Sequence, residues 1–169
     1  MKKVFAMMVF AAAMLFTSYN ANAQLSIHAG YLNDIYGGDA DNSEGGFYAG
    51  ASYNVHAFSV FGVAPGAYIA SSKDRLDLRV PVLLNYRYDL NGDAGVIGFL
   101  GPQVNLGLSG DTYDIAKKLG LGLNLGLGFA YQKFSIELGY MFNFINQYDG
   151  PFDADVYFNQ LTVGVGFTL

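Results

Sequence analysis

The chain has 169 residues, enough for one domain, and carries nine basic residues against fourteen acidic ones. This acidic balance argues against nucleic-acid binding, which needs a basic surface. Cysteine is absent, which excludes disulfides, thiol chemistry and cysteine-ligated zinc. Charged residues make up 14% of the chain, whereas a typical soluble domain has about 25%. The composition therefore favours a protein that does not rely on a charged surface.

The first 23 residues have the three parts of a secretory signal peptide. Lys2 and Lys3 precede an apolar run over residues 4–16, and Ala21-Asn22-Ala23 has the form of a cleavage site. The run is too short to span a bilayer as a helix, although a retained membrane anchor is the alternative. We expect residues 1–23 to be the signal peptide and residues 24–169 to form one β-barrel domain.

Segments in which large apolar residues alternate with small or polar ones recur along the rest of the chain. A period of two predicts β-strands. No later apolar run reaches the 18 residues of a transmembrane helix. Eight strands are predicted, at residues 25–32, 46–55, 58–71, 76–88, 96–108, 119–131, 134–145 and 156–169.

The connections between these strands fall into two classes. Those after the second, fourth and sixth strands are tight, at residues 55–57, 90–95 and 132–133. Those after the first, fifth and seventh are longer and rich in Asp, Gly and Asn, at residues 33–45, 109–118 and 146–155, and the connection at 72–75 is short but charged. Short turns at one end and longer loops at the other, with an even strand count, are typical of an outer-membrane barrel. We therefore predict an all-β fold, an eight-stranded antiparallel up-and-down transmembrane β-barrel.

The segment Leu119–Tyr131 shows which face of the strands meets which solvent. One face is almost entirely leucine and the other almost entirely glycine, and residues 76–88 and 134–145 also separate apolar from small or polar residues. A soluble barrel with inward leucines would have too little charge on its outer face. In a membrane barrel the leucines contact lipid, and small inward residues leave room for long side chains from opposite strands.

Aromatic residues gather near both ends of the predicted strands, as in the two interfacial girdles of a membrane barrel. The girdle at the tight-turn end is predicted to contain Tyr53, Phe58, Tyr86, Tyr88, Tyr131, Phe134 and Phe167. The girdle at the loop end is predicted to contain Tyr31, Phe47, Tyr68, Phe142, Phe144 and Tyr157.

Two segments resemble a known family. LDLRVPVLLNYRYDL (Leu76–Leu90) resembles a strand of the PorT-like, porin-family outer-membrane β-barrel proteins of Bacteroidota. Asp114–Asn146 resembles the closing hairpin of that family, and the similarity extends over most of the chain after residue 23. These proteins commonly end in an aromatic residue, whereas this chain ends Phe167-Thr168-Leu169. The resemblance implies the fold and a location in the outer membrane, and it brings no catalytic residues.

Five polar residues on the inward faces form a candidate cluster in the lumen. They are Asp77, Arg79, Asn85, Arg87 and Glu137. Arg87 and Glu137 lie at similar distances from the tight-turn end, so we expect them to meet across the lumen and gate a small pore, or to be part of a polar plug. The plug is favoured, because the interior of an eight-stranded barrel is just filled by side chains.

An enzymatic role is not expected. Ser26 and His28 lie two residues apart on the inward face of the first strand, and some eight-stranded outer-membrane enzymes that deacylate lipid A use a Ser/His/acid set. Such a site must reach lipid at the outer leaflet, whereas His28 is predicted to face inward near the periplasmic end. His56 is predicted in a periplasmic turn, and the chain has no Gly-x-Ser-x-Gly motif.

The predicted outer loops are acidic. Residues 39–44 place oxygen ligands at alternating positions, as calcium prefers, but do not match the EF-hand pattern, so a solvated loop is favoured and no metal site is predicted. Divalent cations that bridge these acids to lipopolysaccharide phosphates are an alternative. The loop acids are Asp34, Asp39, Asp41, Glu44, Asp111, Asp114, Asp149, Asp153 and Asp155.

These observations predict an integral protein of the bacterial outer membrane with a structural role or a surface-loop interaction role. The expected partners are outer-membrane lipid or lipopolysaccharide and an extracellular protein or ligand at the loops, with no nucleic acid and no cofactor. A narrow porin that passes ions or small solutes is the alternative, and a lipid-A-modifying enzyme is the least favoured reading.

Overall fold

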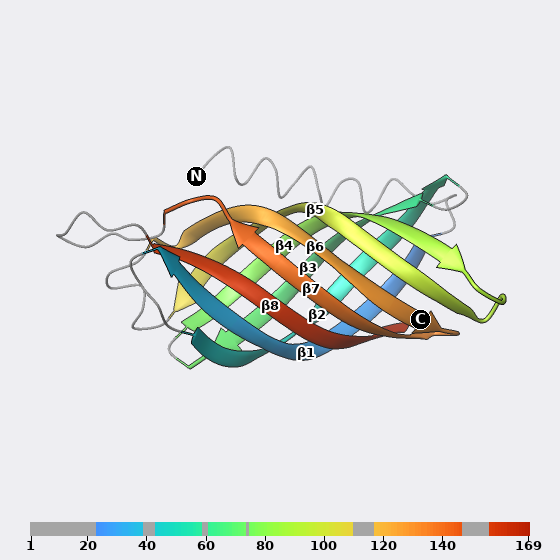
Figure 1. Cartoon of the computed structure of the whole chain (residues 1–169), viewed down its shortest axis with the longest axis horizontal. Coiled ribbons are helices and arrows are strands. Elements are labelled where there is room, and N and C mark those ends of the chain that lie inside the picture. Colours follow the sequence, from blue (N-terminus) through green and yellow to red (C-terminus); the bar gives the residue numbers. More distant parts are fainter. Residues whose placement is uncertain (1–22, 39–42, 59–60, 74, 110–116, 147–155) are drawn as a thin grey trace.

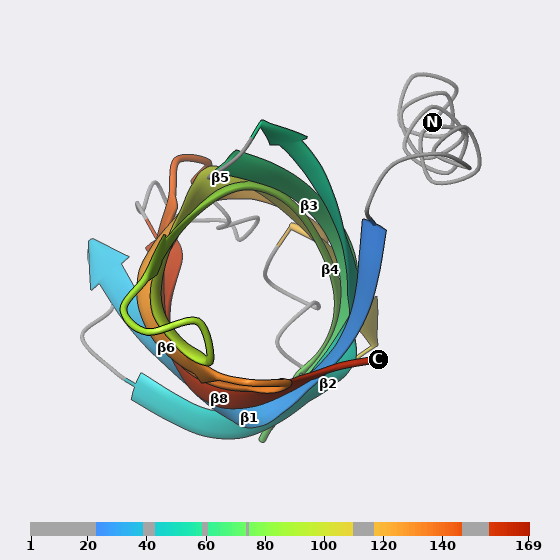
Figure 2. The same cartoon turned by 90° about the vertical axis from the view of Figure 1, so that its right-hand side faces the viewer.

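The structure is a computed structural model that describes residues 23–38, 43–58, 61–73, 75–109, 117–146 and 156–169. Eight strands form one sheet that closes into a barrel, in which each strand pairs with its neighbours in the chain and β1 also pairs with β8. All pairings are antiparallel, and the strands are tilted relative to the long axis of the barrel (Figure 1; end-on in Figure 2). The strands are β1 (Ala23–Gly38), β2 (Ser43–Phe58), β3 (Phe61–Ser72), β4 (Arg75–Asp89), β5 (Ala94–Ser109), β6 (Leu119–Tyr131), β7 (Phe134–Asn143) and β8 (Val156–Thr168).

The prediction of an eight-stranded antiparallel barrel is confirmed. Closure matters because an open sheet edge would leave backbone N–H and C=O groups without partners in hydrocarbon. No helix in the described part of the chain is long and apolar enough to cross a membrane.

The two ends of the barrel differ in their connections. The end that carries Ala23 and Thr168 also has the β4–β5 turn at residues 90–93 and the β6–β7 turn at Gln132-Lys133, and we call it the turn end. Gln132 has a φ of 53°, and its N–H donates to the carbonyl of Asp93 in the neighbouring turn at 2.7 Å. The opposite end, where β5–β6 and β7–β8 are joined by longer segments, is the loop end.

Several strand boundaries were predicted wrongly. β1 continues to Gly38 and β2 begins at Ser43, so the predicted first loop at 33–45 is mostly strand. At the other end of β2 the strand continues to Phe58, which places His56 in a strand rather than in the predicted turn. The reason is that Asp, Gly and Asn occupy ladder positions here, where cross-strand hydrogen bonds outweigh their weak strand propensity.

The wall of the barrel has an apolar outer face, as predicted. Leu121, Leu125 and Leu138 are 42%, 37% and 52% exposed and therefore point away from the lumen. The alternating inward residues of β6 are glycine, Asn124 and Ala130. A belt of exposed leucine, isoleucine and valine with so little charge matches the surface that a membrane barrel presents to lipid.

The inward glycines make room for aromatic side chains. A Cβ at Gly126 would meet the ring of Phe99, and a Cβ at Gly164 or Gly30 would meet the ring of Tyr48. Phe99 therefore occupies space that Gly126 leaves free on the adjacent strand, and Tyr48 occupies space that Gly30 on adjacent β1 and Gly164 on β8 leave free. This packing explains why the glycine face of β6 turns inward.

The aromatic girdles are largely confirmed. Tyr86, Tyr88, Tyr131 and Phe134 are exposed near the turn end, and Tyr31, Phe47, Phe142 and Phe144 near the loop end. Tyr68 is an exception, because it points into the lumen, where its ring packs edge-on against His28 at 5.7 Å between ring centroids. Its place in β3 has the same parity as Gly62 and Ala64, which also face inward.

Candidate functional site

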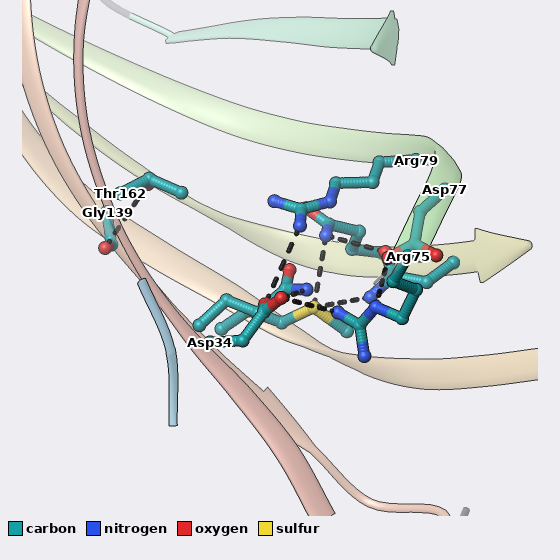
Figure 3. A network of polar contacts seen from close by, with 10 residues as sticks. Asp34, Arg75, Asp77, Arg79, Gly139 and Thr162 are labelled. Atoms are coloured by element: carbon teal, nitrogen blue, oxygen red, sulfur yellow. Dashed lines mark hydrogen bonds and ion pairs between the residues drawn. The ribbon is translucent and has the colours of Figure 1, made fainter. Parts of the chain in front are cut away.

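Five buried polar residues, which we call the lumen plug, gather in the half of the lumen nearer the loop end: Asp34, Arg75, Asp77, Arg79 and Gln160 (the first four are labelled in Figure 3). Asp34 is at its centre. Its Oδ2 lies 2.9 Å from Nη2 of Arg75, and its Oδ1 accepts a hydrogen bond of 2.8 Å from Nε2 of Gln160. Nη2 of Arg79 lies 3.7 Å from the same Oδ1, and Asp77 Oδ2 lies 3.0 Å from Nε of Arg75.

The lumen plug combines distant parts of the chain. Asp34 comes from β1, the two arginines and Asp77 from β4, and Gln160 from β8, which is the neighbour of β1 in the closed sheet. No member of the plug is more than 5% exposed. Two carboxylates against two guanidinium groups give a neutral cluster. Neutrality matters because an unpaired charge in this position would keep its full desolvation cost.

A layer of amides borders the plug. Nε2 of Gln103 donates to Oδ1 of Asn105 at 2.8 Å, and both side chains contact the sulfur of Met141. Nδ2 of Asn124 donates to Oε1 of Gln103 at 2.7 Å. The Arg75 guanidinium carbon also lies 4.7 Å from the centroid of the Phe158 ring. These contacts fix the side chains around the ion pairs.

Beyond this layer the lumen opens in two steps towards the turn end. A chamber of about 60 Å³ is lined by Tyr48, Tyr68 and Phe99 together with Arg79 and Gln103. Next to it is a cavity of about 430 Å³, which we call the inner vestibule. The two share His28, Tyr68, Leu83, Phe99 and Glu137 as lining residues.

The inner vestibule is lined by apolar residues and by short or neutral polar side chains, the latter being Gln24, Ser26, Ser52, Asn54, Asn85, Gln132, Ser135 and Thr168. Its charged side chains are Arg87, Asp89, Lys133 and Glu137. Nε of Arg87 lies 2.7 Å from Oδ1 of Asp89, and this pair is solvent-exposed, with 36% and 61% of the two side chains accessible. Ser26 and Thr168, on β1 and β8, join their hydroxyls at 2.9 Å.

His28 stands at the boundary between the chamber and the vestibule. Its Nε2 lies 2.9 Å from the Ser52 hydroxyl, and its Nδ1 lies 3.4 Å from Oε2 of Glu137. The Ser135 hydroxyl donates to the other carboxylate oxygen of Glu137 at 2.7 Å. Three strands that are not all adjacent, β1, β2 and β7, therefore contribute to one hydrogen-bonded row.

The structure divides the five predicted lumen residues between the two halves. Asp77 and Arg79 belong to the lumen plug, whereas Asn85, Arg87 and Glu137 line the inner vestibule. The expected contact between Arg87 and Glu137 is not formed. Arg87 pairs instead with Asp89 two residues away on its own strand, and Glu137 is bound by His28 and Ser135.

The alternation of the predicted strands does not reach the centre of the plug. Asp34 was predicted in an outer loop and Arg75 in a connection, yet both lie in strands and are buried. A signal was present, because Arg75, Asp77 and Arg79 share one parity in β4, and Asp34 shares the parity of His28 in β1. Extending each alternation by one or two periods would have placed them inward.

The acidic residues predicted in the surface loops are mostly not described. Asp39, Asp41, Asp149, Asp153 and Asp155 lie outside the described residues, as do Asp111 and Asp114. Glu44 lies in β2 opposite Asp34 of β1 and is half-buried, which corrects its assignment to an exposed loop. Among the described residues, no group of three or more His, Cys, Asp or Glu side chains could hold a metal ion.

No family model matches the chain, and no curated protein matches it significantly. Solved structures do match. Neisserial surface protein A is 17% identical, with 88% of this chain and 99% of that chain covered and a TM-score of 0.57. The outer membrane protein OprG from Pseudomonas aeruginosa is 14% identical, with 88% and 97% covered and a TM-score of 0.52.

These likenesses concern the fold. Together with the closed eight-stranded sheet and the apolar outer belt, they support a location in the bacterial outer membrane. Because short turns of such barrels face the periplasm, the turn end with its inner vestibule is the periplasmic end. The lumen plug then lies nearer the cell surface.

Proposed function

We propose that the protein is an integral outer-membrane barrel whose lumen is closed, so that its role is structural or is carried by its surface loops. The lumen plug is the observation that carries this proposal, since its ion pairs fill the lumen between β1, β4 and β8. A barrel that conducted solutes would need an uninterrupted polar path, whereas here the polar groups bind one another across the axis.

The predicted signal peptide at residues 1–23 belongs to the same proposal, since an outer-membrane protein must first be exported. Its expected partner is outer-membrane lipid or lipopolysaccharide around the leucine belt. A second expected partner is an extracellular protein or ligand that binds the acidic loops. Divalent cations would bridge those acids to lipopolysaccharide phosphates. Membership in the PorT-like, porin-family barrels of Bacteroidota rests on the resemblance of Leu76–Leu90 and Asp114–Asn146.

A narrow porin is the second candidate, and the inner vestibule is the observation that favours it. The vestibule and the adjoining chamber extend from the turn end to Arg79 and Gln103, so the plug and its amide layer separate a substantial cavity from the loop end. A pore would need these side chains to move aside. The gate would then be Arg75 and Arg79 rather than Arg87, which is bound to Asp89.

Conductance across a planar bilayer separates the two candidates. We expect the refolded wild-type protein to show no steady open state. The double variant Asp34→Ser, Arg75→Ser removes one charge of each sign from the plug and should raise conductance sharply, because the ion pair between β1 and β4 is lost and the long Arg75 side chain no longer crosses the lumen. Arg87→Ser, Asp89→Ser removes the exposed pair and should leave conductance at the wild-type level.

A steady open state of the wild-type protein would contradict the closed barrel and support the porin. If the wild-type protein is closed and the plug variant stays closed as well, the plug is not what seals the lumen. Circular dichroism of both variants checks that the β-barrel has formed before conductance is compared.

A further inference from the structure

The hydroxyl of Ser52 lies beside an imidazole in a part of the lumen that is open to the periplasmic end. In the β1–β2 ladder Ser52 is opposite Ser26 and His28 is opposite Gly50, so Ser52 and His28 are diagonal neighbours on the inward face. Because Gly50 has no side chain, His28 can turn towards β2, and its Nε2 reaches Ser52 Oγ at 2.9 Å. The contact joins β1 and β2, whose relative position is already fixed by the backbone hydrogen bonds of their ladder.

The second ring nitrogen of His28 faces a carboxylate. Nδ1 lies 3.4 Å from Glu137 Oε2, although β8 stands between β1 and β7. Gly166 of β8 makes this approach possible, because a Cβ there would lie 3.0 Å from His28 Nδ1 and would collide with the Ser135 hydroxyl. Ser135 in turn holds the other oxygen of Glu137. The carboxylate is therefore fixed on the side of the ring that faces away from Ser52.

The order hydroxyl, imidazole, carboxylate is the arrangement that activates a serine. A carboxylate at Nδ1 favours the tautomer that carries its proton there, which leaves the lone pair of Nε2 to accept the serine proton. An adjacent base is what a serine needs to become a nucleophile, since its hydroxyl is weakly nucleophilic by itself. The Tyr68 side chain is a further hydrogen-bond partner of Ser52 on the inward face.

The row is accessible from one side. Ser52, His28 and Glu137 all line the inner vestibule, whose volume of about 430 Å³ admits a small molecule, and Ser52 itself is 9% exposed. The lumen plug separates the row from the loop end. A substrate would therefore enter from the periplasm and would be small and largely uncharged, since neutral hydroxyl and amide side chains outnumber the charged ones in the lining.

We propose that Ser52 is a nucleophilic serine that cleaves small carboxylic esters in the inner vestibule, with His28 as its general base and Glu137 as the residue that positions His28. The Ser52 oxygen bonds to the acyl carbon, its proton passes to His28 Nε2, and the proton then leaves with the alcohol as the ester C–O bond breaks. Water, activated by the same nitrogen, releases the carboxylic acid and restores the serine. This activity goes beyond the closed barrel proposed above and does not depend on the loops.

A small organophosphorus fluoride, diisopropyl fluorophosphate, tests the serine directly on the refolded full-length barrel. Attack of Ser52 forms an O–P bond, fluoride leaves, and the proton goes to His28, so an activated serine acquires a stable adduct. We expect mass spectrometry of the digested wild-type protein to find the adduct on Ser52. His28→Gln should lower the labelling rate by about 10²-fold or more, the usual contribution of a general base.

Matched controls separate activation from mere exposure. Ser26 is opposite Ser52 in the same ladder, but its hydroxyl is bound to Thr168. The Ser26→Ala variant should therefore acquire the adduct on Ser52 at the wild-type rate. Glu137→Gln should slow labelling by about tenfold or more, and Glu137→Asp should recover part of the loss, which a purely structural carboxylate would not produce. Circular dichroism confirms that each variant keeps its sheet.

Two results would overturn the proposal. One is a folded wild-type protein that acquires no adduct on Ser52, or that is labelled equally on Ser26 and Ser135. The other is an unchanged labelling rate in folded His28→Gln. In either case the row is a hydrogen-bonded filling of the lumen without nucleophilic reactivity. If the single variants fail to fold, the site of the wild-type adduct still decides the matter.

Discussion

The two halves of the lumen are built by the same eight strands but are filled in different ways. Near the loop end, buried charged side chains from β1 and β4 meet in ion pairs. Near the turn end the inward positions carry serines, a threonine and amides beside His28, Glu137 and the exposed Arg87–Asp89 pair, and a cavity of about 430 Å³ remains. The same strands therefore carry buried, mutually paired charges in one half of the lumen and mainly hydrated polar groups around a cavity in the other.

The two halves should also differ in how strongly they depend on single residues. The ion pairs of the plug are desolvated, so each charge is supported by its partners alone. The Arg87–Asp89 pair at the turn end is exposed, where water and salt screen the charges and a pair contributes about 0–1 kcal/mol. Removing one charge should therefore lower the free energy of unfolding strongly when the charge is in the plug and hardly at all when it is in the Arg87–Asp89 pair.

Asp34→Asn tests this contrast and should have the largest effect on stability. The substitution keeps the shape of the side chain but leaves Arg75 and Arg79 with one carboxylate in place of two. We expect it to lower the free energy of unfolding by about 3–5 kcal/mol, as for other buried pairs that lose one partner. Urea unfolding of the refolded barrel in lipid vesicles measures this change.

Asp89→Asn is the matched control, because it makes the same chemical change in the exposed pair. Its expected cost is below about 1 kcal/mol. Similar costs for the two variants would remove the distinction between a desolvated plug and a hydrated vestibule. A small cost for Asp34→Asn alone would mean that water reaches the plug.

Sequence reasoning found the strands and their faces because both depend on local pattern. The alternation of leucine and glycine over Leu119–Tyr131 predicts β6 with its observed bounds. In a membrane barrel the two faces of a strand meet media of opposite polarity, so the polarity of a residue predicts whether its side chain faces lipid or the lumen. The alternation predicts that Asp77, Arg79, Asn85, Arg87 and Glu137 face inward, and in the structure these side chains lie on the lumen side.

The partners of those residues could not be predicted in the same way. Which side chains meet across a barrel depends on the tilt and stagger of the strands, and these are properties of the closed sheet. Arg87 and Glu137 appeared to lie at one level, yet each binds another residue. Turn-forming residues were a second source of error, because Asn33, Asp34 and Gly45 look like a loop but lie in the paired ends of β1 and β2.

Leu125→Arg tests the wall that both halves share and should have the second largest effect. Leu125 is the central residue of β6, lies beside Leu100 and Tyr140 on the neighbouring strands, and points outward. An arginine on the lipid face near the bilayer midplane costs roughly 2–4 kcal/mol. Asn124→Ser, one residue away on the lumen face, should cost about 1 kcal/mol, the loss of one hydrogen bond to Gln103. If the two variants lower the free energy of urea unfolding equally, the assignment of Leu125 to the lipid face and Asn124 to the lumen face is wrong.

Gly126→Ala acts on the boundary between the two halves and should have the smallest of the three effects. Its new methyl group would meet the ring of Phe99, which lines both the chamber and the vestibule, and the backbone carbonyl of Leu138. Overpacking of this kind costs about 1–3 kcal/mol. Gly98→Ala on β5 is the matched control, because its methyl group would find its nearest neighbour, a methyl carbon of Leu127, at 3.8 Å. If both alanines lower the free energy of unfolding equally, the ring of Phe99 has room to move. The aromatic layer between the lumen plug and the inner vestibule is then not a fixed part of the fold.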